Sequence, residues 1–325
     1  MPALTNAGLN IAPFKRARLN LLRVLLDEQR DEWLERLHWD YSEASSLLRD
    51  VIRRGELPGF LVEAQGSPVG FAFYVAEESR CSIGDVYVSR KWRGTGADAS
   101  LVETIMEKVR ERPRLFRVEC QSVSFGNSGA DAFFCANGFN RFDRNFMSAD
   151  LKDAASLYPD RARSMSDRFL IRTWDDSHFS AVARTIYRSY RGEDDSKINS
   201  LYATEEGCGE LLSILTETIW CGSFQPEVSK VAVDRDGVSI VGAAIVSRIA
   251  PRVGHIGQVS VLPEYQGFGI GRALITEVIS ELQGMGYSRS SLAVTTTNER
   301  ASRLYNKCGF KTVHSFPVYY SDQYK

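Results

Sequence analysis

The stretch Ile256–Arg272 reads IGQVSVLPEYQGFGIGR, and it decides the fold of its half of the chain. Residues 258–261 alternate in the way typical of a strand, which runs into Pro263, and three glycines follow at alternate positions. An apolar periodicity typical of a helix then begins at Gly271. Glycines let the backbone approach a ligand, and the free N–H groups of a first helical turn bind phosphate. The stretch therefore predicts an anion site at the start of a helix over Gly271–Leu282.

A second copy of this stretch lies 173 residues earlier (256 − 83 = 173). Residues Ile83–Gly96 read IGDVYVSRKWRGTG, and six of these 14 positions are identical to those of Ile256–Gly269. Downstream, NSGADAFFCANGF from Asn127 matches NERASRLYNKCGF from Asn298 at an offset of 171. A repeat of this length predicts two domains of one fold, fused in tandem.

The order of elements in the second copy predicts an α+β domain, a mixed sheet flanked by helices. Helical patterns cover 179–190, 210–220, 271–282 and 299–308, and strand patterns cover 169–173, 230–234, 238–247, 258–261, 290–295 and about 312–319. The first copy follows suit after helical patterns over 17–37 and 45–54. We expect domains over 1–151 and 168–325, joined by a polar linker over 152–167 that contains Pro159.

Composition restricts the classes of function. The chain of 325 residues is long enough for two domains, and its net charge of −1 predicts no general attraction to nucleic acid or to a membrane surface. No apolar run approaches the roughly 20 residues of a membrane span, and the polar first ten residues predict no secretory signal. The six cysteines are scattered without a C-x-x-C pair, so we expect reduced thiols, no metal site and a cytoplasmic protein.

Other phosphate-binding motifs fit the glycines less well. A P-loop needs a Lys-Ser/Thr pair, which neither copy supplies. The dinucleotide fingerprint G-x-G-x-x-G needs Gly or Ala where Arg272 stands. Residues 94–99 of the first copy do fit it, but the polar stretch Ser89–Arg93 separates strand from glycine. A glycine-rich turn without a ligand is the structural alternative, although a cation in a first helical turn is unfavourable unless an anion lies beside it.

The pattern Gln266-x-x-Gly269-x-Gly271, with Asn298 and Tyr305 downstream, resembles the two cofactor motifs of the GNAT superfamily of N-acetyltransferases. The resemblance covers the whole second copy in element order, so the chain is identified as a tandem GNAT member. It implies a sheet splayed at strand 258–261 and direct transfer of an acetyl group from acetyl-CoA to an amine. The cofactor-binding residues that it implies are Val259, Val261, Gln266, Gly267, Gly269, Gly271, Arg272, Asn298 and Tyr305.

The resemblance also implies catalytic roles. A backbone N–H near Val259 would polarise the thioester carbonyl, and Tyr305 would protonate the departing thiolate. Tyr305 follows Asn298 by seven residues, about two helical turns, so both side chains can share one helix face. The general base is less defined: His255 could titrate in the useful range, a structural histidine is the alternative, and some amines need no strong base.

The first copy lacks the groups that the second copy keeps. Asp98 stands at the position of Gly271, Ala99 at that of Arg272, and Phe134 at that of Tyr305. A carboxylate beside the expected pyrophosphate opposes its binding, so we expect the first copy to be non-catalytic.

The sequence leaves the amine acceptor open, whether a small molecule or a peptide. The stretch Tyr187–Asp195 (YRSYRGEDD) is acidic at its end and could attract an ammonium group, or it is a solvated loop. The tandem arrangement also resembles the mycothiol synthases, which would imply an amino-sugar thiol conjugate. A non-catalytic acyl-CoA sensor or scaffold is the alternative from a different class of function.

Overall fold

The computed structural model describes residues 8–14, 19–152, 168–235 and 237–322. The chain divides into two compact units. The N-terminal unit comprises Met1–Glu35, Asp40–Asp143 and Phe316–Lys325, and the C-terminal unit comprises Arg36–Trp39 and Arg144–Ser315. Two of the boundaries thus fall within strands, β6 (Asn140–Asp150) and β13 (Lys311–Ser321), and another falls near the end of the helix over Leu19–Leu37.

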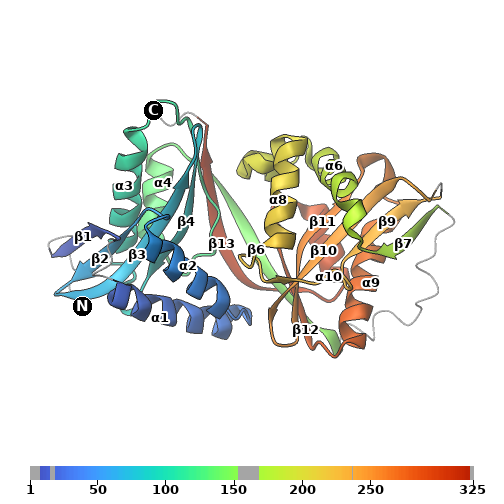
Figure 1. The fold of residues 1–325 in the computed structure, drawn as a ribbon, viewed down its shortest axis with the longest axis horizontal. Helices are drawn as coiled ribbons and strands as arrows, with labels where there is room; N and C mark the ends of the chain where they lie inside the picture. Colours follow the sequence, from blue (N-terminus) through green and yellow to red (C-terminus); the bar gives the residue numbers. More distant parts are fainter. Residues whose placement is uncertain (1–7, 15–18, 153–167, 236, 323–325) are drawn as a thin grey trace. The chain divides into compact units, whose positions relative to one another are not determined.

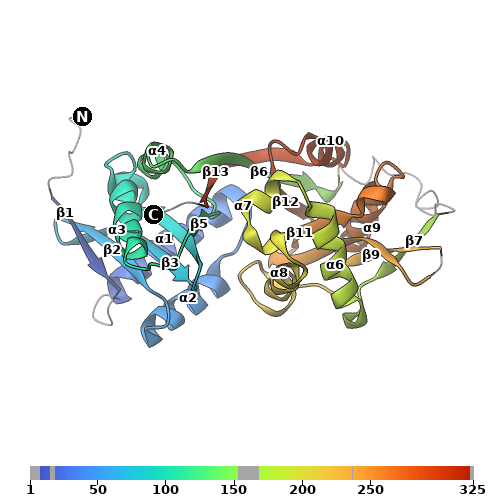
Figure 2. The same cartoon turned by 90° about the horizontal axis from the view of Figure 1, so that it is seen from above.

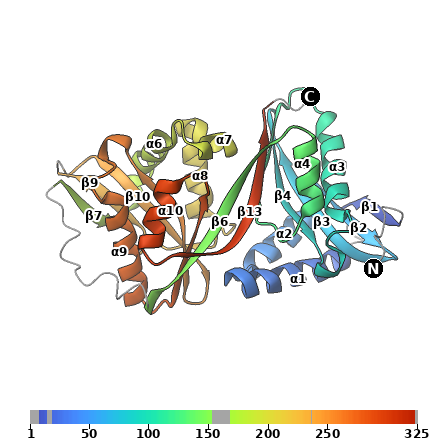
Figure 3. The same cartoon turned by 180° about the vertical axis from the view of Figure 1, so that it is seen from behind.

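The N-terminal unit is a sheet covered by helices on both faces. Helices α1 (Leu19–Leu37) and α2 (Ser42–Arg54) lie on one face, and α3 (Ala97–Arg110) and α4 (Ser128–Ala136) lie on the other (Figures 1 and 3). The strands follow the order β1 (Leu9–Pro13), β2 (Gly59–Ala64), β3 (Ser67–Ala76), β4 (Arg80–Val88), β5 (Arg117–Cys120) and β13.

The C-terminal unit repeats this plan. Its strands follow the order β6, β12 (Arg289–Thr295), β11 (Val253–Val261), β10 (Ile240–Ala250), β9 (Lys230–Asp234) and β7 (Phe169–Thr173), with β8 (Ser223–Phe224) paired to β10. Its helices are α6 (Phe179–Tyr190), α7 (Asp194–Ile198), α8 (Glu205–Glu217), α9 (Ile270–Gly284) and α10 (Glu299–Lys307). Figure 2 shows α10 and α8 on opposite sides of the sheet.

Central strands of this sheet are apolar on both faces because helices cover both. Val231 and Val233 of β9 pack with α6 and α8 in one core, whereas Ala232 packs with α9 in the other. Successive side chains of a strand point to opposite faces, so an unbroken apolar run such as Val231–Val233 is what a doubly covered strand requires. The core that contains Ala232 holds α9 against the sheet, and the start of α9 is thereby fixed beside the end of β11.

Each sheet contains a strand from the other sequence repeat. In the N-terminal unit β13 pairs antiparallel with β5, with Tyr319 opposite Cys120. In the C-terminal unit β6 pairs antiparallel with β12, from Asp150 opposite Arg289 to Arg144 opposite Thr295. These strands cover backbone edges that would otherwise be left unpaired. The expected domain boundaries at 151 and 168 stay a prediction, and residues 153–167 of the expected linker lie outside the described ranges.

The predicted fold class is confirmed: both repeats form mixed sheets flanked by helices. The helix expected over 210–220 instead runs from Glu205 to Glu217. It begins earlier because Thr204 Oγ1 accepts a hydrogen bond from the backbone N–H of Gly207 at 2.9 Å, and two glutamates occupy the first turn. Within the described ranges, no helix is long and apolar enough to cross a membrane.

Candidate active site

The C-terminal sheet opens between β11 and β12. The two strands pair in parallel only from Val253 opposite Arg289 to Ile256 opposite Leu292. Beyond that point β11 stays paired with β10 and β12 stays paired with β6, so the two edges separate. Gly257 forms a bulge at the point of separation, because Ile256 and Gln258 pair with consecutive residues of β10.

Backbone groups of β11 point into this opening. The carbonyl of Val259 accepts a hydrogen bond from the Tyr190 hydroxyl at 3.3 Å, and that of Val261 accepts one from Gln266 Nε2 at 3.1 Å. In a strand, the N–H and C=O of one residue point to the same side. The N–H groups of Val259 and Val261 therefore face the opening as well, where an extended ligand could pair with them.

The glycine turn lies at the end of the same strand. Gly267 has φ 84° and Gly269 has φ 85°, a left-handed conformation that side chains rarely adopt. Gly269 is the N-cap of α9, and it provides no side chain to satisfy the first N–H groups of the helix. A Cβ at Gly271 would lie 3.2 Å from Leu304 Cδ2, so this position is also closely packed. The turn leaves the positive end of α9 exposed to a ligand.

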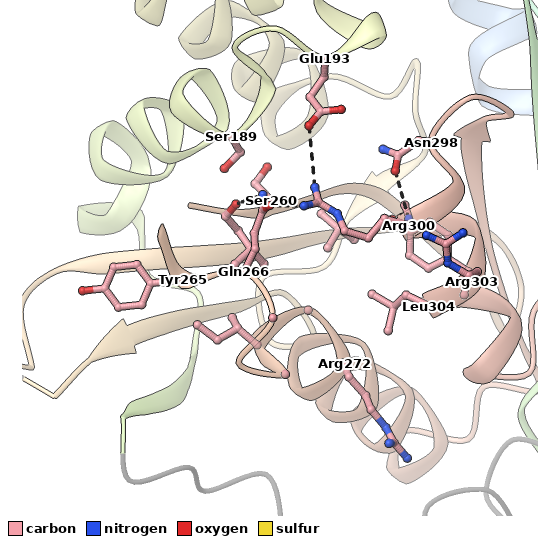
Figure 4. A pocket seen from close by; sticks show the side chains of 18 of the residues that line it. Ser189, Glu193, Ser260, Tyr265, Gln266, Arg272, Asn298, Arg300, Arg303 and Leu304 are labelled. Atoms are coloured by element: carbon pink, nitrogen blue, oxygen red, sulfur yellow. Dashed lines mark hydrogen bonds and ion pairs between the residues drawn. The ribbon is translucent and has the colours of Figure 1, made fainter. Parts of the chain in front are cut away.

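A cavity of about 490 Å³ joins the turn to the open strand edge. This volume is within the usual range for small-molecule sites. All nine residues that the sequence implies for cofactor binding line it: Val259, Val261, Gln266, Gly267, Gly269, Gly271, Arg272, Asn298 and Tyr305. Figure 4 shows the Arg272 side chain extending along α9, away from Gln266 and Arg300. The backbone of Arg272 is therefore the part of this residue nearest to the turn.

Cations on α10 were missed by the sequence reasoning. Arg300, Arg303 and Lys307 line the same cavity and are spaced so that they share one helix face. Arg300 lies across the mouth of the cavity, where it contacts Gln266 Oε1 and lies 3.8 Å from a carboxylate oxygen of Glu193 (Figure 4). The spacing i, i+3, i+7 of basic residues after Asn298 was the available signal. Together with the start of α9, these groups give the cavity a positive side suited to phosphate.

Asn298 and Tyr305 are placed by α10. The side chain of Asn298 caps the helix, accepting the N–H of Ala301 at 3.0 Å. Tyr305 is buried, at 8% exposed, and lines both this cavity and a second one. Burial, and then the charge of Asp195, raise the pKa of Tyr305 well above its usual range. The hydroxyl thus stays protonated at neutral pH and can donate a proton.

His255 lies at the second cavity, of about 110 Å³, and not among the residues lining the first. Its ring stacks on Phe146, with centroids 5.7 Å apart, and lies beside Trp39, while Nδ1 is 2.9 Å from Ser291 Oγ. Burial lowers the pKa of His255 to about 4. The imidazole is neutral at pH 7 but would be a weak base, and a role in catalysis stays a prediction.

The corresponding region of the N-terminal unit is occupied by its own side chains. Asp98, 3% exposed, accepts the N–H of Ala130 at 2.8 Å, so its carboxylate bridges the starts of α3 and α4. Asn127 Nδ2 donates to the carbonyl of Val86 at 2.6 Å, on the strand edge that matches Val259. The glycine turn survives, with φ 86° at Gly96.

The glycine turn of the N-terminal unit also contacts α1, through Arg93. Arg93, which matches Gln266 in the repeat, donates from Nη1 to Glu32 Oε1 at 2.8 Å. Glu32 is fully buried and accepts from the Tyr87 hydroxyl at 3.4 Å as well. Buried charges in proteins are normally paired in this way. The side chains of Arg93, Asp98 and Asn127 therefore all have partners within this unit.

The C-terminal unit thus combines a splayed mixed sheet, a glycine turn before a helix and a buried tyrosine beside the opening. The chain belongs to the acetyltransferase (GNAT) family, whose sequence profile matches residues 19–139 and again residues 196–310. The predicted family and the predicted tandem arrangement are both confirmed. In the described part of the chain, no group of three or more His, Cys, Asp or Glu residues could hold a metal ion.

Individual relatives match shorter segments. The chain is 43% identical over 60 residues to the mycothiol acetyltransferase of Paenarthrobacter aurescens, which covers 18% of this chain and 19% of that protein. It is 36% identical over 89 residues to the N-alpha-acetyltransferase RimI of Mycobacterium tuberculosis, covering 26% and 54%. The matched segments thus span from a fifth to about half of these relatives' lengths.

Solved structures share the fold over nearly the whole chain. A GNAT protein from Sphaerobacter thermophilus superposes with a TM-score of 0.65 at 21% identity, covering 97% of this chain and 96% of the other. A tandem GNAT protein from the clavulanic acid biosynthesis pathway superposes with a TM-score of 0.58 at 14% identity, covering 98% and 99%. At sequence identities of 14% and 21%, these superpositions show a shared fold and nothing further.

Proposed function

We propose that the C-terminal unit transfers an acetyl group from acetyl-CoA directly to an amine. The observation that carries the proposal is a single cavity that brings together the open edge of β11, the glycine turn and Tyr305. These groups come from one contiguous motif and from α10, and each offers one part of what direct transfer needs.

The residues present fit acetyl-CoA part by part. The backbone groups of Val259 and Val261 would pair with the pantetheine arm, for which the Gln266 side chain would have to leave the Val261 carbonyl. The N–H groups after Gly269 would bind the pyrophosphate. Arg300, Arg303 and Lys307 would add positive charge beside the phosphates.

The bound thioester supplies an activated acetyl group, and the protein orients it and moves protons. A backbone N–H near Val259 would stabilise the oxygen of the tetrahedral intermediate. Tyr305 would donate its proton to the sulfur as the C–S bond breaks, and the proton released by the new amide nitrogen would restore the phenol. The position of Tyr305 beside the open edge of β11 supports this role, because Tyr305 and Val259 line the same cavity.

The N-terminal unit, in this proposal, does not catalyse transfer. Asp98 places a carboxylate at the position of Gly271, Asn127 bonds the Val86 carbonyl that matches that of Val259, and Phe134 stands at the position of Tyr305. Phe134 stacks on Tyr319 of β13, with ring centroids 4.3 Å apart, in the core of that unit. We propose that its retained role is structural.

The acceptor and the cellular location remain parts of the proposal. Similarity to a mycothiol acetyltransferase and to RimI motivates an amino-sugar conjugate and a peptide N-terminus as candidate acceptors. All six cysteines are free thiols, which supports a reducing compartment such as the cytoplasm.

The test is thiol release from acetyl-CoA in the presence of single amines. The panel should include a cysteinyl amino sugar, a free amino sugar, a short peptide, a polyamine and an aryl-alkyl amine, with longer acyl-CoA donors in parallel. We expect acetyl-CoA binding by calorimetry and amine-dependent thiol release with at least one acceptor. Binding without any release would favour the sensor or scaffold role, and no binding would refute the proposal.

A further inference from the structure

A carboxylate is fixed inside the second cavity. Asp195, at the start of α7, has a side chain only 13% exposed. Its Oδ1 accepts hydrogen bonds from Thr295 Oγ1 at 2.8 Å and from Arg144 Nη2 at 3.0 Å. Both bonds use the same oxygen, and among the described residues Oδ2 has no hydrogen-bond donor. Asp195 is partly buried, and Oδ2 is therefore free to accept a hydrogen bond from a ligand that enters the cavity.

The partners of Asp195 are held by the sheet. Thr295 ends β12 and lies opposite Arg144 of β6 in the antiparallel ladder. Arg144 Nε is 3.3 Å from Thr295 Oγ1, so Arg144, Thr295 and Asp195 form one connected group. Arg144 belongs to the first sequence repeat, and β6 carries it into the C-terminal unit. The first repeat therefore supplies a side chain to the site of the second.

The cavity around Asp195 is also lined by Val259 and Tyr305, the two groups that the proposed reaction uses. Tyr190, Tyr202, Gln258, His255 and Tyr305 line it together with Arg144 and Asp195. The rings of Tyr190 and Tyr202 stack with centroids 4.2 Å apart. Asp195 is the only carboxylate among the described residues that line this cavity. After burial, its charge is the next-largest cause that raises the pKa of Tyr305, so the two groups interact.

We propose that Asp195 Oδ2 binds the acceptor's ammonium group and takes its proton, and that Arg144 is the positioning residue that aims this carboxylate. The inference rests on the proposed function. One proton passes from the ammonium to Asp195 and then to solvent, leaving the neutral amine to attack the thioester carbon. The second proton leaves the nitrogen as the amide forms and replaces the one that Tyr305 gives to sulfur. The acceptor is then an amine that is protonated at neutral pH.

The test compares Asp195→Asn with Asp194→Asn, its neighbour on α7, in the full-length protein. Asp194 pairs with Lys197 at 2.8 Å and does not line the second cavity, so it controls for loss of charge on the helix. For the best amine of the panel, we expect Asp195→Asn to lower kcat/KM on the order of 10²–10⁴-fold at pH 7. Affinity for acetyl-CoA should stay within about twofold in both variants, since Asp195 does not line the first cavity.

The pH profile gives a readout that a purely structural role would not move. In Asp195→Asn, kcat/KM should rise with pH until the amine itself deprotonates, because the free base then needs no acceptor for its first proton. In the wild type and in Asp194→Asn the profile should be flatter over the same range. An Asp195→Asn variant with wild-type kcat/KM and profile would overturn the inference while leaving the proposed function intact. A wild type without transfer to any amine would overturn both.

Two substitutions of Arg144, one that removes its charge and one that keeps it, test the positioning role. Arg144→Met should raise KM for the amine and lower kcat, with acetyl-CoA affinity unchanged, whereas Arg144→Lys should recover part of the loss because it keeps a cation near Asp195. If Arg144→Met loses folded structure, as judged by circular dichroism, Thr295→Val removes the other donor to Oδ1 and should reproduce the same split. Equal activity of Arg144→Met and wild type would refute the positioning role.

Discussion

The carboxylate of Asp98 bonds the backbone N–H of Ala130 at 2.8 Å, whereas the matching N–H in the second repeat, that of Ala301, is bonded by Asn298. In the first repeat the asparagine has left this role and bonds the Val86 carbonyl on β4 instead. The two repeats therefore bond the same helix start with different side chains, an aspartate from α3 in the first repeat and the N-cap asparagine in the second.

Asp98→Ala should destabilise the N-terminal unit by about 1–2 kcal/mol, because the N–H of Ala130 loses its partner in a buried setting. Urea unfolding followed by tryptophan fluorescence measures this. Glu103→Ala, on an exposed face of the same helix, is the control and should change stability by less than about 0.5 kcal/mol. A stable Asp98→Ala variant would show that the bond contributes little.

Gly269→Asp should abolish acetyl-CoA binding by the C-terminal unit, since it places a carboxylate at the pyrophosphate seat and a side chain at φ 85°. The repeat offers a matched control, Gly96→Asp, at φ 86° in the N-terminal unit. The backbone strain is the same in both variants, so only the ligand distinguishes them. Calorimetry should show lost affinity in the first variant and retained affinity in the second, and the reverse result would assign the cofactor to the N-terminal unit.

Tyr305→Phe should lower kcat on the order of 10²–10⁴-fold with little change in acetyl-CoA affinity. Because burial and Asp195 raise the pKa of Tyr305, the phenol stays protonated above pH 10, and wild-type kcat should show no alkaline fall from this group below that pH. Tyr287→Phe, which removes a hydroxyl bonded to Gln225 outside the cavities, should be active. A fully active Tyr305→Phe variant would mean that solvent protonates the thiolate.

His255 should make stability fall as the pH is lowered from about 6.5 to 4. Burial lowers the pKa of His255 to about 4 in the folded protein. Between pH 6.5 and 4 the histidine is therefore protonated in the unfolded chain but still neutral in the folded protein, which favours unfolding. The full effect is on the order of 3 kcal/mol at pH 4. His255→Gln should flatten the pH dependence of the urea midpoint, whereas His314→Gln, on a partly exposed part of β13, should not. An unchanged slope in His255→Gln would show that the ring is already protonated or accessible.

Much of this fold could be predicted because local signals agree with the tertiary structure. The helix over 179–190 and the strands at 169–173 and 230–234 were predicted to the residue, since each is bounded by polar or turn-forming residues. The grouping of residues around the larger cavity could be predicted too, because they come from one contiguous motif and one helix.

The rest depends on pairings that no local pattern carries. Asp195 reads as the end of a charged loop, and only the ladder of β6 with β12 brings Arg144 to it from 51 positions away in the sequence. The partner of Arg93 is Glu32, 61 positions earlier on α1. The apolar periodicity of α1 predicts a helix but does not predict which loop that helix contacts. Of the two strands exchanged between the repeats, β13 was predicted near 312–319, whereas no range was predicted for β6, and no local pattern shows which sheet either strand joins.

This strand exchange has a consequence for how the protein is made. Tyr319 pairs with Cys120, so the sheet of the N-terminal unit is completed only after another 199 residues have been synthesised (319 − 120 = 199). The ribosome thus delivers the second repeat before the first can close its sheet, and β5 keeps an unpaired edge in the meantime. Pairings this distant in sequence form slowly. The nascent first repeat would therefore be the stage at which chaperones are most needed, although it is the first part of the chain to leave the ribosome.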